Sequence, residues 1–242
     1  MFNFDKKNLI IIICIIAGFW IFSRGTNEIL VTLLTLPGVL IALTFHEFAH
    51  AWTAVKLGDD TPKYQGRLNL NPISHIDPVG FLFLIIAGFG WGKPVEINPR
   101  NFNGKYSLSK AEAIVAAAGP IMNFILAFVF LIIYYLIYRT TDLTIANLQN
   151  IWQIVLYYIV MINIGLGVFN LIPIPPLDGS KILMHFLPYN GKEWFARNEQ
   201  YLYIAFTVLW ITGLSSVIIS PIFSAVYSGM AFVVEKLLGL FI

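Results

Sequence analysis

The stretch Thr44-Phe-His-Glu-Phe-Ala-His-Ala51 lies at the end of a long apolar segment. The seventeen residues Ile29–Phe45, immediately before His46, include no charged side chain. An apolar run of this length is typical of a helix that crosses a membrane. Ionisable side chains at membrane depth are costly unless they are paired or used in a function. The sequence therefore predicts a membrane helix in which two histidines and a glutamate have a chemical role.

The spacing of these three residues indicates a metal site. His46 and His50 are four positions apart, so on a helix they lie on one face and can share a metal ion, while Glu47 lies about 100° around the helix. The pattern H-E-x-x-H is typical of zinc peptidases, in which the metal lowers the pKa of a bound water and polarises the scissile carbonyl. The pattern predicts His46 and His50 as zinc ligands and Glu47 as the general base.

The whole chain has the composition of a polytopic membrane protein. It has 242 residues, of which 58% are hydrophobic and 12% charged, against about 25% charged in soluble domains; the mean hydropathy is +0.76. Its net charge of +2 gives no indication of a nucleic-acid partner. The pattern predicts an all-α polytopic protein with about six transmembrane helices, at residues 9–22, 29–55, 111–138, 145–172, 201–219 and 221–242.

We expect one integral-membrane domain over residues 1–242, with a core at 29–187, an N-terminal anchor at 8–23 and C-terminal spans over 201–242. The N-terminal segment resembles a signal peptide but lacks a small-x-small cleavage site, so we expect it to be retained. Because the sequence has one cysteine, Cys14, an intramolecular disulfide is excluded.

The region between the second and third predicted spans has two unusual features. The apolar run Val79–Phe89 is too short to cross a membrane, which favours a re-entrant or interfacial segment. Apolar and polar residues alternate in Tyr64–Asn71 and Lys93–Asn98, which predicts a small β-hairpin. The hairpin is either only structural, or its exposed edge pairs with an extended substrate.

The distribution of charge predicts the orientation. If the N-terminus is cytoplasmic and the chain crosses six times, thirteen of the fifteen Lys and Arg side chains lie inside and only Arg24 and Arg139 lie outside. An excess of cations in cytoplasmic loops is the usual arrangement. The second span then runs inward, so His46, His50 and Asp178 lie toward the cytoplasmic side.

A catalytic zinc ion usually takes three protein ligands and keeps one position for water, so a third ligand is expected. No glutamate follows Glu47 for more than forty residues, and Asp59 and Asp60 look solvated. Asp178 lies in the stretch 169–179, where three prolines interrupt a helix at membrane depth; this is tolerated where the backbone lines a cavity or water. Asp178 either completes the metal site or only caps the following helix; the nearby H-E-x-x-H pattern favours the ligand.

Three separated motifs give the chain a resemblance to the site-2 protease family of intramembrane zinc metalloproteases. The stretch Asn69–Gly80, followed by Gly90–Val95, is similar to the compact bacterial and archaeal branch. Many members carry a PDZ or CBS domain, for which we expect no room here. The motifs are His46-Glu-Phe-Ala-His50, Gly119-Pro-Ile-Met-Asn123, and Asn170 through Leu177-Asp178-Gly179.

This resemblance extends over about Leu36 to Leu187. It implies one zinc ion held by His46, His50 and Asp178, Glu47 as the base, and cleavage of transmembrane segments of other membrane proteins. It also implies a prokaryotic cell membrane as the location.

Two intramembrane asparagines have alternative roles. Asn123 either joins helices by hydrogen bonds or, as the resemblance favours, binds the substrate backbone beside the metal. Asn170 either satisfies carbonyl groups freed by Pro173 or donates to the oxyanion of the reaction. For His75 and Asp77 we expect structural support, because a fourth protein ligand would close the position that water needs.

Two other classes of function compete with a protease. A catalytically silent binding module would not need Glu47, which is not a ligand. A zinc transporter would more often show paired, inverted repeats of broken helices, and the two halves of this sequence do not resemble each other. The sequence gives no indication of the oligomeric state.

Overall fold

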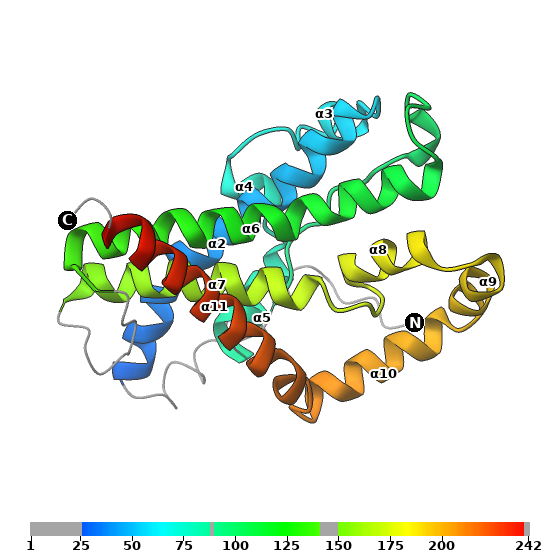
Figure 1. The fold of residues 1–242 in the computed structure, drawn as a ribbon. Coiled ribbons are helices and arrows are strands. Elements are labelled where there is room, and N and C mark those ends of the chain that lie inside the picture. Colours follow the sequence, from blue (N-terminus) through cyan, green and yellow to red (C-terminus); the bar gives the residue numbers. More distant parts are fainter. Residues whose placement is uncertain (1–25, 88–89, 141–149, 240–242) are drawn as a thin grey trace, which may run out of the picture.

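The computed structural model describes residues 26–87, 90–140 and 150–239, and these residues form an all-helical protein. Four of the described helices are long and apolar enough to cross a membrane. They are α2 (Thr26–Lys56), α6 (Leu108–Tyr138), α7 (Ile151–Asn170) and α11 (Ser215–Gly239). Figure 1 shows α6 and α7 running side by side along the molecule, with α2 and α11 crossing them obliquely.

Shorter helices occupy the connections. Between α2 and α6 lie α3 (Thr61–Tyr64), α4 (Pro72–His75), α5 (Pro78–Ala87) and the 3-10 helix η1 (Pro99–Asn101). Between α7 and α11 lie α8 (Asp178–Phe186), α9 (Tyr189–Arg197) and α10 (Glu199–Ile211). Helix α8 packs along α6, so the chain after α7 returns to the bundle.

The prediction of about six crossings is corrected to four candidates among the described residues. The first predicted span, residues 9–22, and the anchor at 8–23 lie outside the described residues. The span predicted at 201–219 is divided, because α10 stops at Ile211 and Gly213 adopts a positive φ of 72°. Thirteen residues of helix extend about 20 Å, less than a hydrocarbon core of about 30 Å.

This division also changes the predicted side of one cation. Leu238, near the end of α11, packs into the same core cluster as Tyr138 at the end of α6. Lys236 therefore lies at the same end of the bundle as Arg139, and opposite the end at which Lys56 closes α2. The prediction that placed Lys236 with Lys56 counted α10 and α11 as two crossings, whereas α10 is too short for a crossing.

Small residues let α2 approach its neighbours closely. A Cβ atom on Gly38 would lie 3.0 Å from the Tyr158 carbonyl oxygen of α7, and Ala42, Ala49, Ala51 and Ala54 of α2 are all buried. Small residues are typical of helix interfaces in membranes. Helices α6, α7 and α11 pack around a buried hydrophobic cluster of their own. It comprises Ala127, Leu131, Tyr134, Val160, Ile164, Val168 and Val234.

The predicted β-hairpin does not form. Among the described residues, the β pairing is one isolated antiparallel bridge between Ile76 and Gly92. In the first predicted strand, Asn69 and Asn71 bond backbone N–H groups two residues further on, and such local bonds compete with strand pairing. In the second, the N–H groups of Val95 and Asn98 donate to carboxylates on and beyond α2 instead of to a partner strand.

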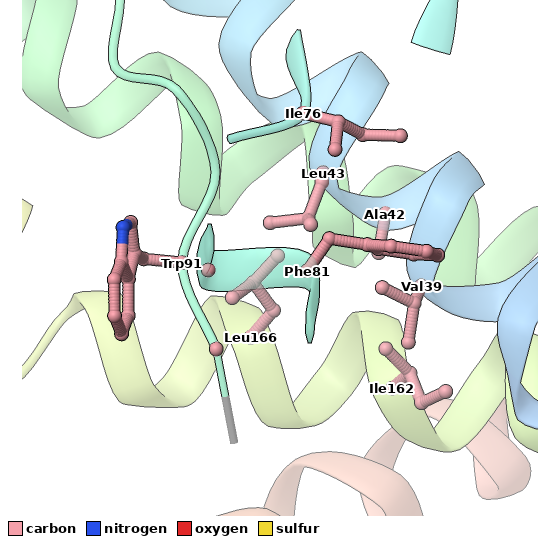
Figure 2. A pocket seen from close by; sticks show the side chains of 10 residues that line it. Val39, Ala42, Leu43, Ile76, Phe81, Trp91, Ile162 and Leu166 are labelled. Atoms are coloured by element: carbon pink, nitrogen blue, oxygen red, sulfur yellow. The ribbon is translucent and has the colours of Figure 1, made fainter. Parts of the chain in front are cut away.

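The short apolar run between the second and third predicted spans forms α5, whose ten residues extend about 15 Å and cannot cross a membrane. Helix α5 and residues 90 and 91 line a small pocket together with residues of α2 and α7. Figure 2 shows side chains from these elements around it. We name this the α5 pocket; it is lined by Val39, Ala42, Leu43, Ile76, Gly80, Phe81, Gly90, Trp91, Ile162 and Leu166.

Candidate metal centre

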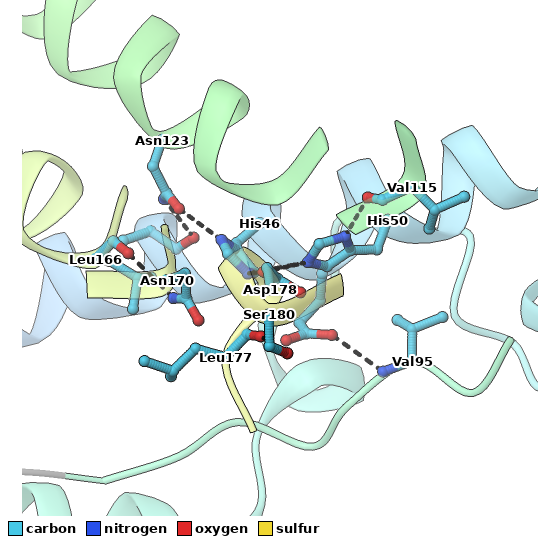
Figure 3. A network of polar contacts seen from close by, with 12 residues as sticks. His46, His50, Val95, Val115, Asn123, Leu166, Asn170, Leu177, Asp178 and Ser180 are labelled. Atoms are coloured by element: carbon cyan, nitrogen blue, oxygen red, sulfur yellow. Dashed lines mark hydrogen bonds and ion pairs between the residues drawn. The ribbon is translucent and has the colours of Figure 1, made fainter. Parts of the chain in front are cut away.

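Three side chains from two distant parts of the chain meet in the structure. The Nε2 atoms of His46 and His50 lie 3.0 Å apart, and each lies 3.2 Å from Oδ2 of Asp178. The histidines come from α2 and the aspartate is the first residue of α8 (Figure 3). These residues form a group that could hold a metal ion.

The outer nitrogens of both rings are already engaged. Nδ1 of His50 lies 2.7 Å from the carbonyl oxygen of Val115, so this nitrogen must carry the hydrogen. Nδ1 of His46 lies 2.6 Å from Oδ1 of Asn123, whose Nδ2 is used as a donor elsewhere. Each neutral ring therefore presents the lone pair of Nε2 to the centre of the site.

This arrangement fits a zinc ion. Two lone pairs and a carboxylate oxygen within 3.2 Å of one another repel unless a cation lies between them. Ligand atoms about 2.0–2.1 Å from a tetrahedral zinc are about 3.3 Å apart. Oδ2 of Asp178 is buried without a hydrogen-bond donor, as expected for a carboxylate that faces a metal. Three protein ligands leave the fourth position free for water.

Gly119 makes room for the two imidazoles. A Cβ atom at this position on α6 would overlap Nε2 of His50 and would lie 2.6 and 2.7 Å from Cε1 and Nε2 of His46. The glycine therefore allows α6 to pass directly over the metal centre.

Asp178 does not cap α8. The N-cap is Leu177, whose carbonyl accepts hydrogen bonds from the backbone N–H and hydroxyl of Ser180. The side chain of Asp178 contacts the two imidazoles instead. The capping alternative is therefore excluded.

The carboxylate of Glu47 makes its hydrogen bond with a part of the chain that the two histidines do not contact. Its Oε2 accepts a hydrogen bond of 3.0 Å from the backbone N–H of Val95, as Figure 3 shows at Val95. The segment that carries Val95 is fixed on both sides: the Lys93 N–H donates to the His75 carbonyl, and the Asn98 N–H donates to Asp59. A held backbone therefore orients the carboxylate.

Asn163 is a polar residue of the site that the sequence analysis missed. Asn123 donates from Nδ2 to the carbonyl of Ala42 and to Oδ1 of Asn163, and Asn163 donates to the carbonyl of Ile159. Both asparagines are fully buried. Asn163 fixes the amide of Asn123, which in turn orients His46; its presence in the apolar helix α7 was the available signal.

The other predicted residues lie as follows. Asn170 donates from Nδ2 to the carbonyl of Leu166 at 3.0 Å. His75 is buried outside the group of three, with Nε2 2.8 Å from the Asn69 carbonyl. Asp77 accepts a hydrogen bond from the Gly80 N–H at the start of α5, which is a structural contact.

Asp59 is not solvated, which corrects the expectation. Its side chain is fully buried and accepts hydrogen bonds from Thr61, Asn98 and Asn101. Burial alone would raise the pKa of Asp59, but these hydrogen bonds outweigh it and lower the pKa below its ordinary value. Asp59 joins the end of α2 to the segment that reaches Glu47.

Comparison with known proteins agrees with this geometry. Residues 34–213 match the model of Peptidase family M50. Three relatives are each named "Putative zinc metalloprotease": YwhC of Bacillus subtilis is 39% identical over 194 residues, covering 77% of this chain and 84% of its own. MJ0611 of Methanocaldococcus jannaschii is 30% identical over 191 residues, with 76% and 86% covered. Rip2 of Mycolicibacterium smegmatis is 29% identical over 192 residues, with 78% and 71% covered.

No solved structure gives a significant match. The family model nevertheless covers most of the chain, from α2 through the end of α10, and so includes all three residues of the metal centre. This chain belongs to peptidase family M50, the family of site-2 proteases.

Proposed function

We propose that this protein is an intramembrane zinc metalloprotease that hydrolyses peptide bonds within or near transmembrane segments of other membrane proteins. The observation that carries the proposal is that Asp178 of α8 meets His46 and His50, which lie on the membrane-type helix α2. We further propose that the whole chain forms one membrane peptidase domain.

His46, His50 and Asp178 hold one zinc ion in this proposal. When bound, zinc supplies a polarised carbonyl and a water of lowered pKa. Hydrogen bonds from Nδ1 of both histidines, to Asn123 and Val115, keep the two Nε2 lone pairs directed at the ion.

Glu47 is the general base. It takes a proton from the water as the water oxygen attacks the scissile carbonyl carbon, and it delivers that proton to the amide nitrogen as the C–N bond breaks. Its position one residue after His46 supports this role. The Val95 N–H leaves Oε1 of the carboxylate available for the proton.

Asn123 and Asn170 are proposed to act on the substrate side of the centre. The alternatives predicted from sequence are distinguished by which atoms are free. Both Nδ2 hydrogens of Asn123 are used within the protein, whereas Asn170 uses Nδ2 once, with Leu166. Asn170 therefore has one N–H left for an oxyanion, and we assign the more direct contact to it.

The site is proposed to lie in the cytoplasmic half of the membrane. Helix α2 is continuous, so His50 lies about 9 Å and His46 about 15 Å from Lys56 along its axis. Cationic side chains gather on the connections at this end, which favours the cytoplasm: Lys56, Lys63, Arg67, Arg100, Lys105 and Lys110. Water reaches the site between residues 170 and 178.

The test uses purified protein in liposomes with a single-span substrate. Wild-type protein should contain about one zinc ion per chain and cleave the substrate; Glu47→Gln should keep the zinc and lose cleavage, because Glu47 is not a ligand. His46→Ala should lose both. Glu193→Gln, on the exposed face of α9, is the control for loss of a carboxylate.

The same preparation tests the rival functions. Zinc retention with no cleavage by the wild type would favour a binding module, and zinc uptake into the liposomes would favour a transporter. Near-normal turnover by Glu47→Gln would contradict the proposed mechanism.

A further inference from the structure

The α5 pocket borders the proposed catalytic carboxylate. Leu43 lines the pocket and lies one helical turn before Glu47 on α2. Gly90 and Trp91 line the other side. A Cβ atom on the next residue, Gly92, would lie 3.7 Å from Cδ2 of Leu43 and 4.0 Å from Oε1 of Glu47. Gly92 therefore lies close both to Leu43, which lines the pocket, and to the carboxylate of Glu47.

The pocket also reaches the second proposed substrate contact. Leu166 lines it from α7, and its carbonyl oxygen accepts the hydrogen bond from Asn170. Figure 2 shows Leu166 beside Trp91 and Phe81, and Figure 3 shows it beside Asn170. Two lining residues, Leu43 and Leu166, are thus neighbours of the proposed base and of the proposed oxyanion donor.

The chemistry of the lining restricts what can enter. Every side chain in it is aliphatic or aromatic, and the indole of Trp91, 46% exposed, stands at the rim. The cavity volume is about 100 Å³, smaller than the cavity of about 150 Å³ that admits benzene. A branched aliphatic side chain fits by size and polarity, whereas an aromatic ring exceeds the space and a charged group would be buried without a partner.

Two contacts join the segments that cover the pocket. A Cβ atom on Gly80 would overlap the Trp91 carbonyl and lie 2.8 Å from its ring, and the bridge between Ile76 and Gly92 joins the two covering segments. These contacts hold α5 and the segment at Trp91 together on one side of the pocket.

We propose that the α5 pocket is a subsite that takes one branched aliphatic side chain, Val, Leu or Ile, of the substrate next to the scissile bond. This inference rests on the proposed protease function. Its position supports the assignment: Ala42 and Leu43 lie about 6 Å along α2 from His46 and Glu47, which corresponds to about two residues of an extended peptide.

The test is a specificity profile. With a single-span substrate in liposomes, the cleavage site is mapped, and each of the two positions on either side of it is changed in turn to Ala, Val, Leu, Phe or Trp. At one of these positions the wild type should prefer Leu or Val over Ala by about tenfold or more in kcat/KM, and should reject Trp.

Two pocket variants should shift this profile in opposite directions. Val39→Phe fills the cavity from α2 and should remove the advantage of Leu over Ala. Phe81→Ala enlarges the cavity from α5 and should admit Phe. Leu33→Phe, on the exposed face of α2, is the matched control and should keep the wild-type profile.

The outcomes separate the two proposals. If the wild type cleaves but the variants lower all rates equally, the pocket serves only packing and the subsite is wrong. If the loss depends on the acyl chain length of the lipid instead of on the substrate residue, the pocket holds a lipid chain and the subsite is again wrong. If the wild type cleaves nothing, the proposed function itself fails, and the subsite with it.

Discussion

The backbone N–H of Val95 donates a hydrogen bond of 3.0 Å to Oε2 of Glu47, across 48 residues of sequence. A backbone donor cannot change rotamer, so the carboxylate keeps one orientation as long as the segment around Val95 stays in place. Lys93 and Asn98, on either side, are bonded to His75 and Asp59. The connection between α2 and α6 thus acts directly on the proposed base.

Val95→Pro removes this N–H and should lower kcat by about tenfold or more while zinc stays bound, because the orientation of Glu47 is lost and no metal ligand changes. Parallel measurements of zinc content and kcat check this expectation. Val95→Ala keeps the N–H and is the control. Equal losses in the two variants would mean that the side chain, and not the hydrogen bond, matters.

Asn163→Leu should weaken zinc binding by about 10–100-fold, because the amide of Asn123 would lose the partner that fixes it against His46. The measurement is the rate of zinc loss to a chelator in detergent. Asn163→Gln, which keeps an amide, should recover part of the affinity. Zinc retention equal to wild type in Asn163→Leu would show that Asn123 needs no support from α7.

Gly119→Ala should abolish zinc binding and activity together, because the added methyl group overlaps the two imidazoles. Gly229→Ala is a matched control in α11: a Cβ atom there meets nothing within 4 Å. The control should keep full activity and gain slightly in helix stability. A Gly119→Ala protein with normal zinc content would contradict the close approach of α6 to the metal centre.

Much of this site could be predicted from local pattern alone. The spacing of His46 and His50 fixes their relation within one helix, and the structure retains it. Asp178 is predicted as a ligand because prolines interrupt a helix at membrane depth just before it, and this signal also belongs to the local sequence. The roles proposed for these residues are still predictions; their proximity is what the structure establishes.

Two of the failures have a common physical origin in contacts between distant residues. The alternation in 93–98 is that of a strand, but its N–H donors pair with Asp59 and Glu47, which no local pattern reveals. Asn163 has a role only because α7 brings it to Asn123. The division of the span at 201–219 depends on the backbone conformation of one glycine, Gly213.

Asp59→Asn should destabilise the protein at neutral pH by about 1–3 kcal/mol, because three residues donate to the buried carboxylate. The folded-state pKa of Asp59 is lowered, so this stabilisation is fully present above the unfolded value of about 3.9. It is lost as the pH falls below that value toward the folded pKa.

Thermal unfolding of both proteins between pH 7 and pH 3 measures this difference, and the two curves should converge at the acidic end. Asp60→Asn is the control, since the neighbouring Asp60 makes no side-chain capping bond at α3. A difference between wild type and Asp59→Asn that stays constant down to pH 3 would contradict a lowered pKa.

The orientation of the bundle sets the side from which the substrate is cut. In a background with Cys14 replaced by Ser, single cysteines at Lys63 and Lys105 should react with an impermeant reagent only from the cytoplasm. Cysteines at Arg139 and Lys236 should react only from outside, because α6 and α11 end together at the opposite side of the bundle. All four side chains are exposed, so failure to react cannot be attributed to burial.

The products provide an independent check of this orientation. With His46 and His50 about 15 and 9 Å from the cytoplasmic end of α2, the new termini should map to the cytoplasmic half of the substrate's membrane segment by mass spectrometry. Reaction of Lys63→Cys from outside, together with cuts near the opposite surface, would invert the topology. Reaction of Lys236→Cys from the cytoplasm would instead restore α10 and α11 as two separate crossings.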